Sequence, residues 1–359
     1  MRLRRLHLAD FRNYREASVE LPGGLTVVVG DNGQGKTNLI EAIGYLATLS
    51  SFRGAPTEAL VRTGATSAVI RAEAERDGRE LLLEAEIVPG GRSRAQVNRQ
   101  PLRRARDLLG ALRVSVFSPD DLVIVKEGPG ERRRFLDEAL VALHPRNDSV
   151  RSDVERVLRQ RNALLKQSGG RVTPDIEATL DVWDAKLDDA GTALLAARDD
   201  LVARVGPELG RAYQALAGRP APVRVVYEPA WRETGLAAAL AAARTDDLRR
   251  GITTVGPHRD DLDLFLNELP ARTQASQGEQ RSLALALRLA VHKVVTSVAE
   301  SPPVLLLDDV FSELDPARSD ALLANLPPGQ ALLTTAGVLP TGTHPDALVR
   351  VVDGEVRAD

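Results

Sequence analysis

Eight residues near the amino terminus, numbers 30–37, have the spacing G-x-x-x-x-G-K-[ST]. They follow the apolar run LTVVV at 25–29, so the sequence predicts a buried strand that leads into a glycine-rich loop. Such a loop turns backbone N–H groups toward nucleotide phosphates, while Lys36 places its charge at the β- and γ-phosphates and Thr37 offers a hydroxyl to Mg²⁺. A helix from Asn38 onward would direct its dipole at the anion. The candidate nucleotide-binding residues are Gly30, Asp31, Asn32, Gly33, Gln34, Gly35, Lys36, Thr37 and Asn38.

A chance glycine-rich turn is the alternative to this site. The chain has 28 glycines, but only five of its 47 basic residues are lysines. One of these few lysines stands where a compact ammonium on a flexible stem suits a phosphate. Together with the preceding strand, this position favours the nucleotide site.

Two adjacent aspartates, Asp308 and Asp309, follow the aliphatic run of residues 304–307. Four continuous aliphatics are typical of a central parallel strand buried on both faces, and ligands bind at the carboxyl ends of such strands. We expect Asp308 to bind Mg²⁺ together with Thr37. Asp309 would point to the other side and orient or deprotonate a water, so Lys36 and Asp309 are the candidate catalytic residues. An acidic cap at a strand end is the alternative.

The segment SQGEQR at residues 276–281 leads into nine residues that are apolar nearly all round and predict a buried helix. A helix N-terminus that carries Ser and Gly can bind an anion. Ser276 would donate to a phosphate, and Gly278 would let the backbone approach closely. The same residues also make an ordinary N-cap. The order of motifs favours the functional interpretation, because the phosphate loop precedes this segment and the Asp-Asp strand follows it.

The composition is that of an ordinary globular protein, with 43% hydrophobic and 27% charged residues in a chain of 359. The absence of Cys excludes disulfides, thiol nucleophiles and Cys-ligated zinc, and the five histidines show no ligand spacing. No stretch approaches 18 consecutive apolar residues, and the amino terminus lacks the apolar core of a signal peptide. We therefore expect a cytoplasmic protein that does not contact a membrane.

The net charge of −3 argues against a uniformly basic coat for DNA, but the arginines are unevenly spread. Either they form a surface that binds a polyanion, or they are a solvated face of an arginine-rich protein. One group lies within fifteen residues and a second group follows it: Arg92, Arg94, Arg99, Arg103, Arg104 and Arg106, then Arg132, Arg133 and Arg134.

Short strands separated by Gly and Pro turns dominate the first 120 residues, and strands return after Gly218. Between them lies long helical periodicity, in which apolar residues repeat at steps of four and three as a heptad seam. The expected strands cover residues 3–11, 17–21, 25–29, 68–74, 81–88, 113–117, 223–227, 261–267 and 304–307. The seam residues are Ile176, Leu180, Trp183, Leu187, Ala190, Leu194, Ala197, Leu201 and Val205.

The seam predicts an antiparallel helical hairpin with an upstream helix that carries Val154, Val157 and Leu158. A helix from Pro174 to Val205 would be about 48 Å long at 1.5 Å per residue, enough to protrude from a head domain. A compact helical subdomain that buries the same seam is the alternative.

The order of these motifs resembles that of the ABC-type ATPases and, among them, the RecF family, which is related to the SMC-type chromosomal ATPases. Two residues differ from the transporter-like pattern: Asp309 replaces the usual Glu, and Thr334 or Thr335 stands at the position of the switch His. The RecF family shares both features, and both suggest slow turnover. The segment at 117–122 also has no glutamine for a Q-loop. The matching segments are FRNY (11–14), GDNGQGKTNLIEAI (30–43), FSPDDL (117–122), GERRRFLD (130–137), GPHRDDL (256–262), SQGEQR (276–281) and LLLDDVFSELD (305–315).

The resemblance implies an α/β fold, with an ABC-type P-loop ATPase head of mixed sheet and helices plus an inserted helical, coiled-coil-like arm domain. The head would comprise residues 1–126 and 219–359, and the arm residues 127–218. The implied cofactors are ATP and Mg²⁺. The implied activity is that of a weak ATPase, in which an ATP-dependent homodimer places Ser276 and Gly278 of one copy over the nucleotide of the other. The implied partners are DNA at gaps or junctions, and RecO and RecR, which help to load RecA recombinase.

Three other functions fit parts of the pattern. A nucleotide-binding subunit of an ABC transporter would carry LSGGQ rather than SQGEQ, and a Glu in place of Asp309. A small-molecule P-loop kinase or GTPase would lack the Ser276 segment. A non-enzymatic, ATP-gated DNA clamp differs from the main hypothesis only in the role given to hydrolysis.

Overall fold

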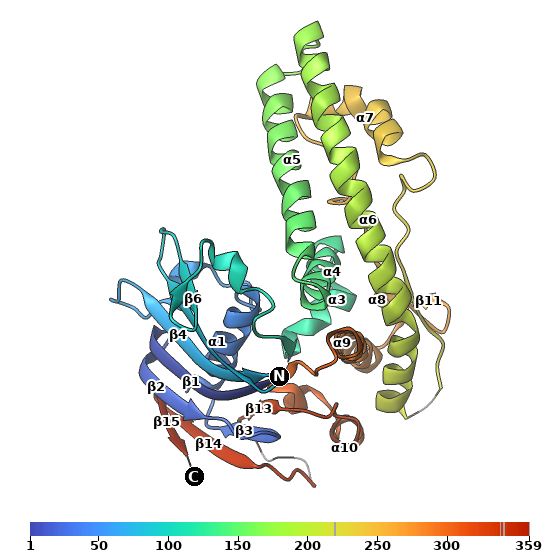
Figure 1. Cartoon of the computed structure of the whole chain (residues 1–359). Helices are drawn as coiled ribbons and strands as arrows, with labels where there is room; N and C mark the ends of the chain where they lie inside the picture. The colour runs from blue at the N-terminus through green and yellow to red at the C-terminus, as the bar shows by residue number, and fades with distance from the viewer. Residues whose placement is uncertain (219, 338, 340–341, 359) are drawn as a thin grey trace. The chain divides into compact units, whose positions relative to one another are not determined.

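The computed structural model describes residues 1–218, 220–337, 339 and 342–358, and Figure 1 traces their path. The chain divides into two compact units. The head unit comprises Met1–Leu122, Arg211–Pro220 and Ser276–Asp359, and the helical unit comprises Val123–Gly210 and Ala221–Ala275.

One sheet of the head unit is antiparallel, with its strands in the order β2-β1-β4-β5-β6-β7. The register of β1 against β4 shifts between Leu3 and Arg5, and both Leu3 and Leu6 are buried although three positions separate them. A bulge of this kind turns the two leucines to one face. The strands are β1 (Arg2–Phe11), β2 (Tyr14–Glu20), β4 (Ala68–Arg76), β5 (Arg79–Ile87), β6 (Arg94–Val97) and β7 (Gln100–Pro101).

The second sheet of the head unit has the order β15-β14-β3-β13-β12-β8 and is parallel except for β15. Every residue of β12 and β13 is buried, as expected for central parallel strands. Because β3, β13 and β12 are neighbours, their carboxyl ends meet at one edge. The strands are β3 (Leu25–Val29), β8 (Val114–Phe117), β12 (Val304–Asp308), β13 (Ala331–Thr335), β14 (Ala347–Val352) and β15 (Glu355–Ala358).

Helices complete the core of the head unit. Ile40 and Ile43 of α1 belong to one hydrophobic cluster with residues of both sheets. Helix α9 is long and apolar enough to cross a bilayer by length and composition alone, but 67% of its apolar window is buried within the protein, so it is weak evidence for a membrane span. The elements are α1 (Lys36–Thr48), α2 (Thr57–Leu60), η1 (Ala105–Leu108), η2 (Pro119–Asp121), α9 (Gln277–Ala299), η3 (Val310–Glu313) and α10 (Pro316–Ala324).

Two long helices, α5 and α6, run side by side in the helical unit as the predicted hairpin (Figure 1). Leu165 of α5, Leu180 of α6 and Leu248 of α7 form a small core between them. With 44 residues, α6 is about 66 Å long and continues past the predicted end at Val205. The elements are α3 (Leu122–Lys126), α4 (Pro129–Leu143), α5 (Asn147–Ser168), α6 (Pro174–Ala217), α7 (Leu236–Arg250), α8 (Ala271–Gln274), β9 (Val223–Val226), β10 (Asp263–Leu266) and β11 (Leu269–Pro270).

The heptad seam of α6 is correct at one of its two positions and also at Val205, which is buried. Leu180, Leu187, Leu194 and Leu201 are buried at intervals of seven. The predicted partners Trp183, Ala190 and Ala197 are only half-buried, and the residues that follow each of them are buried instead. Those residues are Asp184, Gly191 and Arg198, which an apolar pattern does not reveal.

The division into compact units differs from the expected domain boundary. Residues 221–275, which the resemblance assigned to the head, pack with the helices. Strands β9, β10 and β11 form a separate three-stranded sheet rather than an extension of the head sheets. Just after β9, the Tyr227 hydroxyl accepts a hydrogen bond from Arg198 of α6 at 3.2 Å, which ties this segment to the long helix.

Candidate nucleotide-binding site

The glycine-rich loop joins β3 to α1 at the carboxyl edge of the parallel sheet. A Cβ on Gly30 would lie 2.3 Å from the carbonyl oxygen of Val351, so only glycine fits there. Gly33 and Gly35 have φ angles of +84° and +117°, in the region that glycine adopts without strain. Helix α1 begins at Lys36, two residues before the predicted start. Lys36 and Thr37 therefore lie in its first turn.

Lys36 is oriented by its own loop. Its Nζ donates to the carbonyl oxygens of Gly30 at 2.7 Å and Asp31 at 2.8 Å. Burial lowers the pKa of Lys36, while the charges of Asp309, Asp308 and Asp31 act in the opposite direction. The ammonium therefore lies among carbonyls and carboxylates at the mouth of the loop, where a phosphate would be an equivalent partner.

Thr37 and Asp308 meet across the sheet edge. The Thr37 hydroxyl donates to Asp308 Oδ1 at 2.8 Å, and the Thr334 hydroxyl donates to the same oxygen at 2.8 Å. Burial raises the pKa of Asp308, and these hydrogen bonds oppose the shift. A hydroxyl and a carboxylate that converge in this way are the hard oxygen ligands that Mg²⁺ prefers, so the donor set fits the ion.

Asp309 lies in a backbone conformation that a residue with a side chain rarely adopts. Its φ of +47° is left-handed, and its backbone N–H donates to Thr334 Oγ1 at 2.9 Å. Asp tolerates this region better than most residues, but the conformation still stores strain. Thr334, which the sequence placed near the switch position, thus bonds both aspartates of the motif, while Thr335 Oγ1 accepts from the N–H of Gly337 at 3.1 Å.

Residues from the β1–β2 hairpin hold the loop from outside, a role that the spacing of motifs does not predict. Tyr14 OH donates to the carbonyl oxygen of Gly35 at 2.8 Å, and Asn13 Nδ2 donates to that of Gln34 at 2.9 Å. Asn38 Nδ2 in turn donates to Asn13 Oδ1 at 2.8 Å. In the sequence, FRNY marks only a family resemblance. A polar Asn-Tyr pair in a tight hairpin is the one local signal for this role.

Ser276 caps helix α9 rather than joining the phosphate loop within the chain. Its hydroxyl donates to Glu279 Oε2 at 2.8 Å and accepts the N–H of Glu279, which makes a capping box. Ser276 is exposed, and a Cβ on Gly278 would lie 3.0 Å from Arg318 Nη1. Ser276 therefore acts as an N-cap within the chain, and its exposure leaves it accessible for the intermolecular contact.

The segment FSPDDL lacks a Q-loop glutamine and carries a different polar contact. Arg288 of α9 donates to Asp121 Oδ1 through Nη2 at 2.7 Å and through Nε at 3.0 Å. This ion pair anchors the segment to α9, the helix that Ser276 caps.

The two arginine groups differ in exposure. All six arginines of the 92–106 group are exposed, and Arg92 donates to the carbonyl oxygen of Arg103 at 2.9 Å, which brings the two ends of the group together. In the second group Arg132 is buried, and its Nε and Nη2 bond Asp261 at 2.7 and 2.9 Å. The inclusion of Arg132 among candidate DNA contacts was therefore wrong, because that side chain is committed to the core.

The fold and this site together define a P-loop ATPase head of the SMC type. The Smc head domain of Pyrococcus furiosus resembles the chain with a TM-score of 0.58 at 16% identity, a likeness of fold that covers 100% of this chain and 96% of that one. The family model described as the RecF/RecN/SMC N-terminal domain matches residues 2–331.

Among these ATPases, the chain belongs to the RecF family. It is 48% identical to the DNA replication and repair protein RecF of Streptomyces avermitilis, over 94% of each chain. It is 46% identical to that of Acidothermus cellulolyticus, over 95% of this chain and 96% of the relative. A solved structure of the recombination mediator protein RecF with ATP, in the RecFOR pathway, superposes with a TM-score of 0.92 at 28% identity and covers 100% and 97% of the two chains. This family assignment excludes the transporter-subunit and small-kinase alternatives.

Proposed function

We propose that the protein is an ATP-gated DNA-binding switch of recombinational repair. The observation that carries the nucleotide half is the 2.8 Å hydrogen bond from Thr37 to Asp308, because it brings two Mg²⁺ ligands together beside Lys36. Residues 30–38 hold the phosphates, and Thr37 and Asp308 hold the ion. Bound Mg²⁺ neutralises charge on the phosphates.

Asp309 is the proposed general base. Its charge acts on the pKa of Lys36, so it lies near the phosphate end of the loop, and its backbone is fixed by Thr334. The carboxylate would take a proton from the attacking water, while Lys36 stabilises the charge that develops on the transferred phosphoryl group. Its stem is one methylene shorter than that of the Glu usual in transporters, which supports weak turnover.

Ser276 and Gly278 are the proposed contacts to the nucleotide held by a second copy. Two observations support this role: the helix end is exposed, and its dipole favours an anion. A phosphate would replace Glu279 as the partner of the Ser276 hydroxyl. ATP thereby becomes part of the dimer interface, and hydrolysis releases it.

The remaining parts of the proposal follow from the relatives. Two are DNA replication and repair proteins, and the solved RecF belongs to the RecFOR pathway. We propose that this protein acts in the cytoplasm on DNA gaps and single-strand to double-strand junctions, where with RecO and RecR it helps to load RecA. The nucleotide chemistry belongs to the head, and the helical segment from 127 to 218 serves as an arm.

One experiment tests the switch. Sedimentation and gel shift with gapped DNA, with and without Mg²⁺-ATP, would compare the wild type with Lys36→Met. Lys293→Met is the matched control, because Lys293 is an exposed lysine of the same unit. ATP should convert the wild type and the control to a dimer that binds DNA, and Lys36→Met should stay monomeric. A Lys36→Met protein that dimerises with ATP would contradict the proposal.

A further inference from the structure

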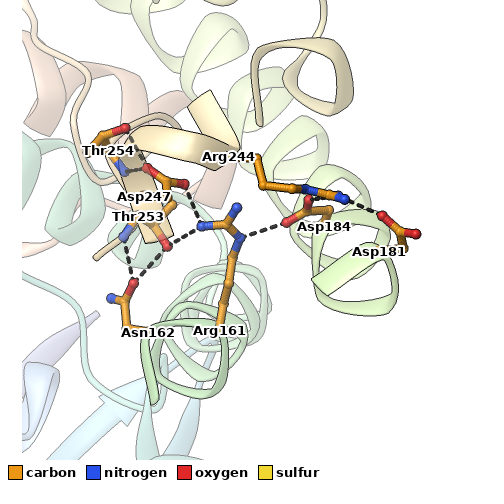
Figure 2. Close-up of polar contacts among 8 residues, drawn as sticks. All are labelled: Arg161, Asn162, Asp181, Asp184, Arg244, Asp247, Thr253 and Thr254. Carbon is orange, nitrogen blue, oxygen red and sulfur yellow. Dashed lines mark hydrogen bonds and ion pairs between the residues drawn. The ribbon is translucent and has the colours of Figure 1, made fainter. Parts of the chain in front are cut away.

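A network of buried charges lies inside the helical unit, where α5, α6 and α7 meet (Figure 2). The side chain of Arg161 is fully buried, and its Nε donates to Asp184 Oδ1 at 2.6 Å. Its Nη1 donates to Asp247 Oδ2 at 2.7 Å. Arg244 donates to the second oxygen of Asp184 at 2.6 Å. Buried ion pairs add little net stability. The main effect of this network is therefore to fix the positions of the segments that it joins.

The network holds the start of the segment that contains GPHRDDL. Arg161 Nη1 also donates to the Thr253 hydroxyl at 2.9 Å, and Asn162 Oδ1 accepts from the Thr253 N–H at 2.7 Å. Asp247 Oδ1 accepts from both the N–H and the hydroxyl of Thr254, at 2.9 and 2.6 Å. Two consecutive threonines are thus fixed by backbone and side chain at once.

Further hydrogen bonds hold the rest of residues 253–261, which we call the arginine loop. His258 Nε2 lies 3.0 Å from the carbonyl oxygen of Thr253. Asp260 accepts hydrogen bonds from Tyr227 at 2.7 Å and Trp231 at 2.9 Å. Asp261 accepts the Arg132 pair described above. A loop with this many anchors has little conformational entropy left to lose on binding.

Arg259 is the exposed member of this anchored loop. Its Nη2 donates to the Thr253 carbonyl at 3.3 Å, which occupies one of five guanidinium donors. Arg133 of α4 joins it, because Arg133 Nη1 donates to the Asp260 carbonyl at 2.7 Å. Burial lowers the pKa of Arg133 and the positive charges of Arg198 and Arg259 lower it further, while the carboxylates of Asp261 and Asp260 act in the opposite direction. Half-exposed Arg133 and exposed Arg259 therefore lie close enough for their charges to interact.

We infer that Arg259 and Arg133 bind a backbone phosphate of DNA, in a site that the arginine loop preorganises. This inference rests on the proposed DNA-binding function and assigns one of its contacts to the helical unit. A phosphate bound beside the two guanidiniums would attract both of them. Planar guanidiniums suit phosphate because they can donate two parallel hydrogen bonds each.

A polyanion suits this surface better than an acidic protein does. A stable protein interface buries about 800 Å² on each partner and has an apolar centre. In the described part of the helical unit, the exposed large hydrophobic side chains are Val172, Val182 and Leu269. They lie on separate elements, in the turn before α6, on α6 and on β11.

The test compares Arg259→Glu with Arg249→Glu, which makes the same charge change at an exposed arginine of α7. Fluorescence anisotropy with a labelled DNA duplex and Mg²⁺-ATP would be measured across salt concentrations. Arg259→Glu should weaken binding by about tenfold, because it removes one charge-assisted hydrogen bond. It should also reduce the salt slope, which is the magnitude of the slope of log K against log salt concentration, by about 0.9. Arg133→Ala should have the same direction of effect, with folding checked by circular dichroism.

The outcomes separate this inference from the proposed function. Failure of the wild type to bind DNA would contradict the proposed function itself. If the wild type binds DNA and Arg259→Glu and Arg249→Glu bind it with equal affinity, the inference is overturned. The same result is expected if Arg259 binds an acidic protein rather than DNA. ATP-driven dimerisation, followed by sedimentation, should be the same in all the variants.

Discussion

Asp308 and Asp309 are neighbours in the chain with different surroundings. Asp308 is buried and accepts hydrogen bonds from Thr37 and Thr334. The backbone of Asp309 is left-handed, and the charge of its carboxylate acts to raise the pKa of Lys36, against the effect of burial. We predict that Asp309→Asn keeps Mg²⁺-ATP but hydrolyses it about 10² to 10⁴ times more slowly, as expected when a general base is removed. Single-turnover hydrolysis would measure this effect.

Asn at position 309 is a clean replacement because Asn also tolerates the left-handed region. Asp308→Asn is the matched comparison, and it should weaken binding of Mg²⁺-ATP and reduce dimer formation. If both substitutions changed ATP affinity equally, the division of roles between the two aspartates would be refuted.

The lowered pKa of His292 predicts how the stability of the protein depends on pH. It is buried in α9, where its Nδ1 lies 2.9 Å from Ser115 Oγ, and burial lowers its pKa to about 4. The pKa of His292 is lower in the folded protein than its unfolded value of 6.5. Its contribution to the free energy of unfolding is therefore fully present above pH 6.5 and is lost as the pH falls toward 4. The free energy of unfolding should drop by on the order of 3 kcal/mol over that window.

Urea denaturation of the wild type and His292→Gln at several pH values would measure the drop. The slope with pH should become shallower in His292→Gln. His344→Gln, which changes an exposed histidine, should keep the wild-type slope. Equal slopes in all three proteins would show that another group governs the acid sensitivity.

Single residues of the site were predictable where local sequence determines their place. Gly30 and Lys36 follow β3 and Asp308 ends β12, and both strands are continuous apolar runs up to these residues, so their position at the sheet edge followed from the pattern. The contacts of Asn13, Tyr14 and Thr334 join segments far apart in the chain, so the local sequence does not specify their partners. The burial of Arg132 was unpredictable for the same reason, since its partner Asp261 is 129 residues away.

Helix α9 carries the next prediction, at the scale of an element. Ser276→Arg should leave nucleotide binding by the monomer nearly intact and block ATP-driven dimerisation, because a bulky cation would occupy the exposed helix end. The substitution also removes an N-cap, which costs about 1 kcal/mol of stability. Ser276→Ala removes the cap without adding bulk, so it separates the two effects.

Analytical ultracentrifugation with and without Mg²⁺-ATP would measure the dimer in both variants. Ser276→Ala should retain more dimer than Ser276→Arg. Normal dimerisation of Ser276→Arg would rule out the arrangement in which this helix covers the nucleotide of a second copy.

The seam of α6 predicts where the helical unit is most sensitive to substitution. Leu180 is fully buried against Leu165 and Leu248. Leu180→Ala should destabilise the unit by about 2 to 5 kcal/mol, the usual cost of a large-to-small change in a core. Val182→Ala, at a side chain that is 52% exposed two residues away, should change stability by less than about 0.5 kcal/mol. Hydrogen exchange of α5 and α6 would report both; similar protection in the two variants would contradict the packing.

The sequence predicted the long helices and strands better than it predicted which compact unit each of them belongs to. The leucines of α6 at intervals of seven identified the helix, but the buried partners Asp184 and Arg198 are stabilised by ion pairs with Arg161 and Asp137, which hydrophobic periodicity cannot show. Strands β6, β7 and β11 were not predicted, and β7 and β11 have only two residues each, too few to show an alternating pattern. The strands at 223–226 and 263–266 were recognised, yet their assignment to the helical unit depends on long-range contacts.

At the scale of the whole molecule, a protein with a net charge of −3 can hold DNA only where positive groups gather. The exposed arginines at 92–106 form such a group in the head unit, and dimerisation would double it. We predict that changing Arg103, Arg104 and Arg106 together to Glu weakens binding to all DNA sequences and lowers the salt slope by about 0.9 for each DNA phosphate that the variant no longer neutralises. ATP-driven dimerisation should be unaffected, because these residues lie outside the nucleotide site.

A charge-matched triple variant controls for the change in net charge. Arg4, Arg15 and Arg357 are exposed arginines of β1, β2 and β15, and their replacement by Glu should alter the salt slope far less. If the two triple variants weaken DNA binding equally, only the overall charge matters and the 92–106 group is a solvated face. If the 103–106 variant and Arg259→Glu each lower the slope, the combined variant should lower it by the sum, because phosphates bound at independent sites release their counterions independently.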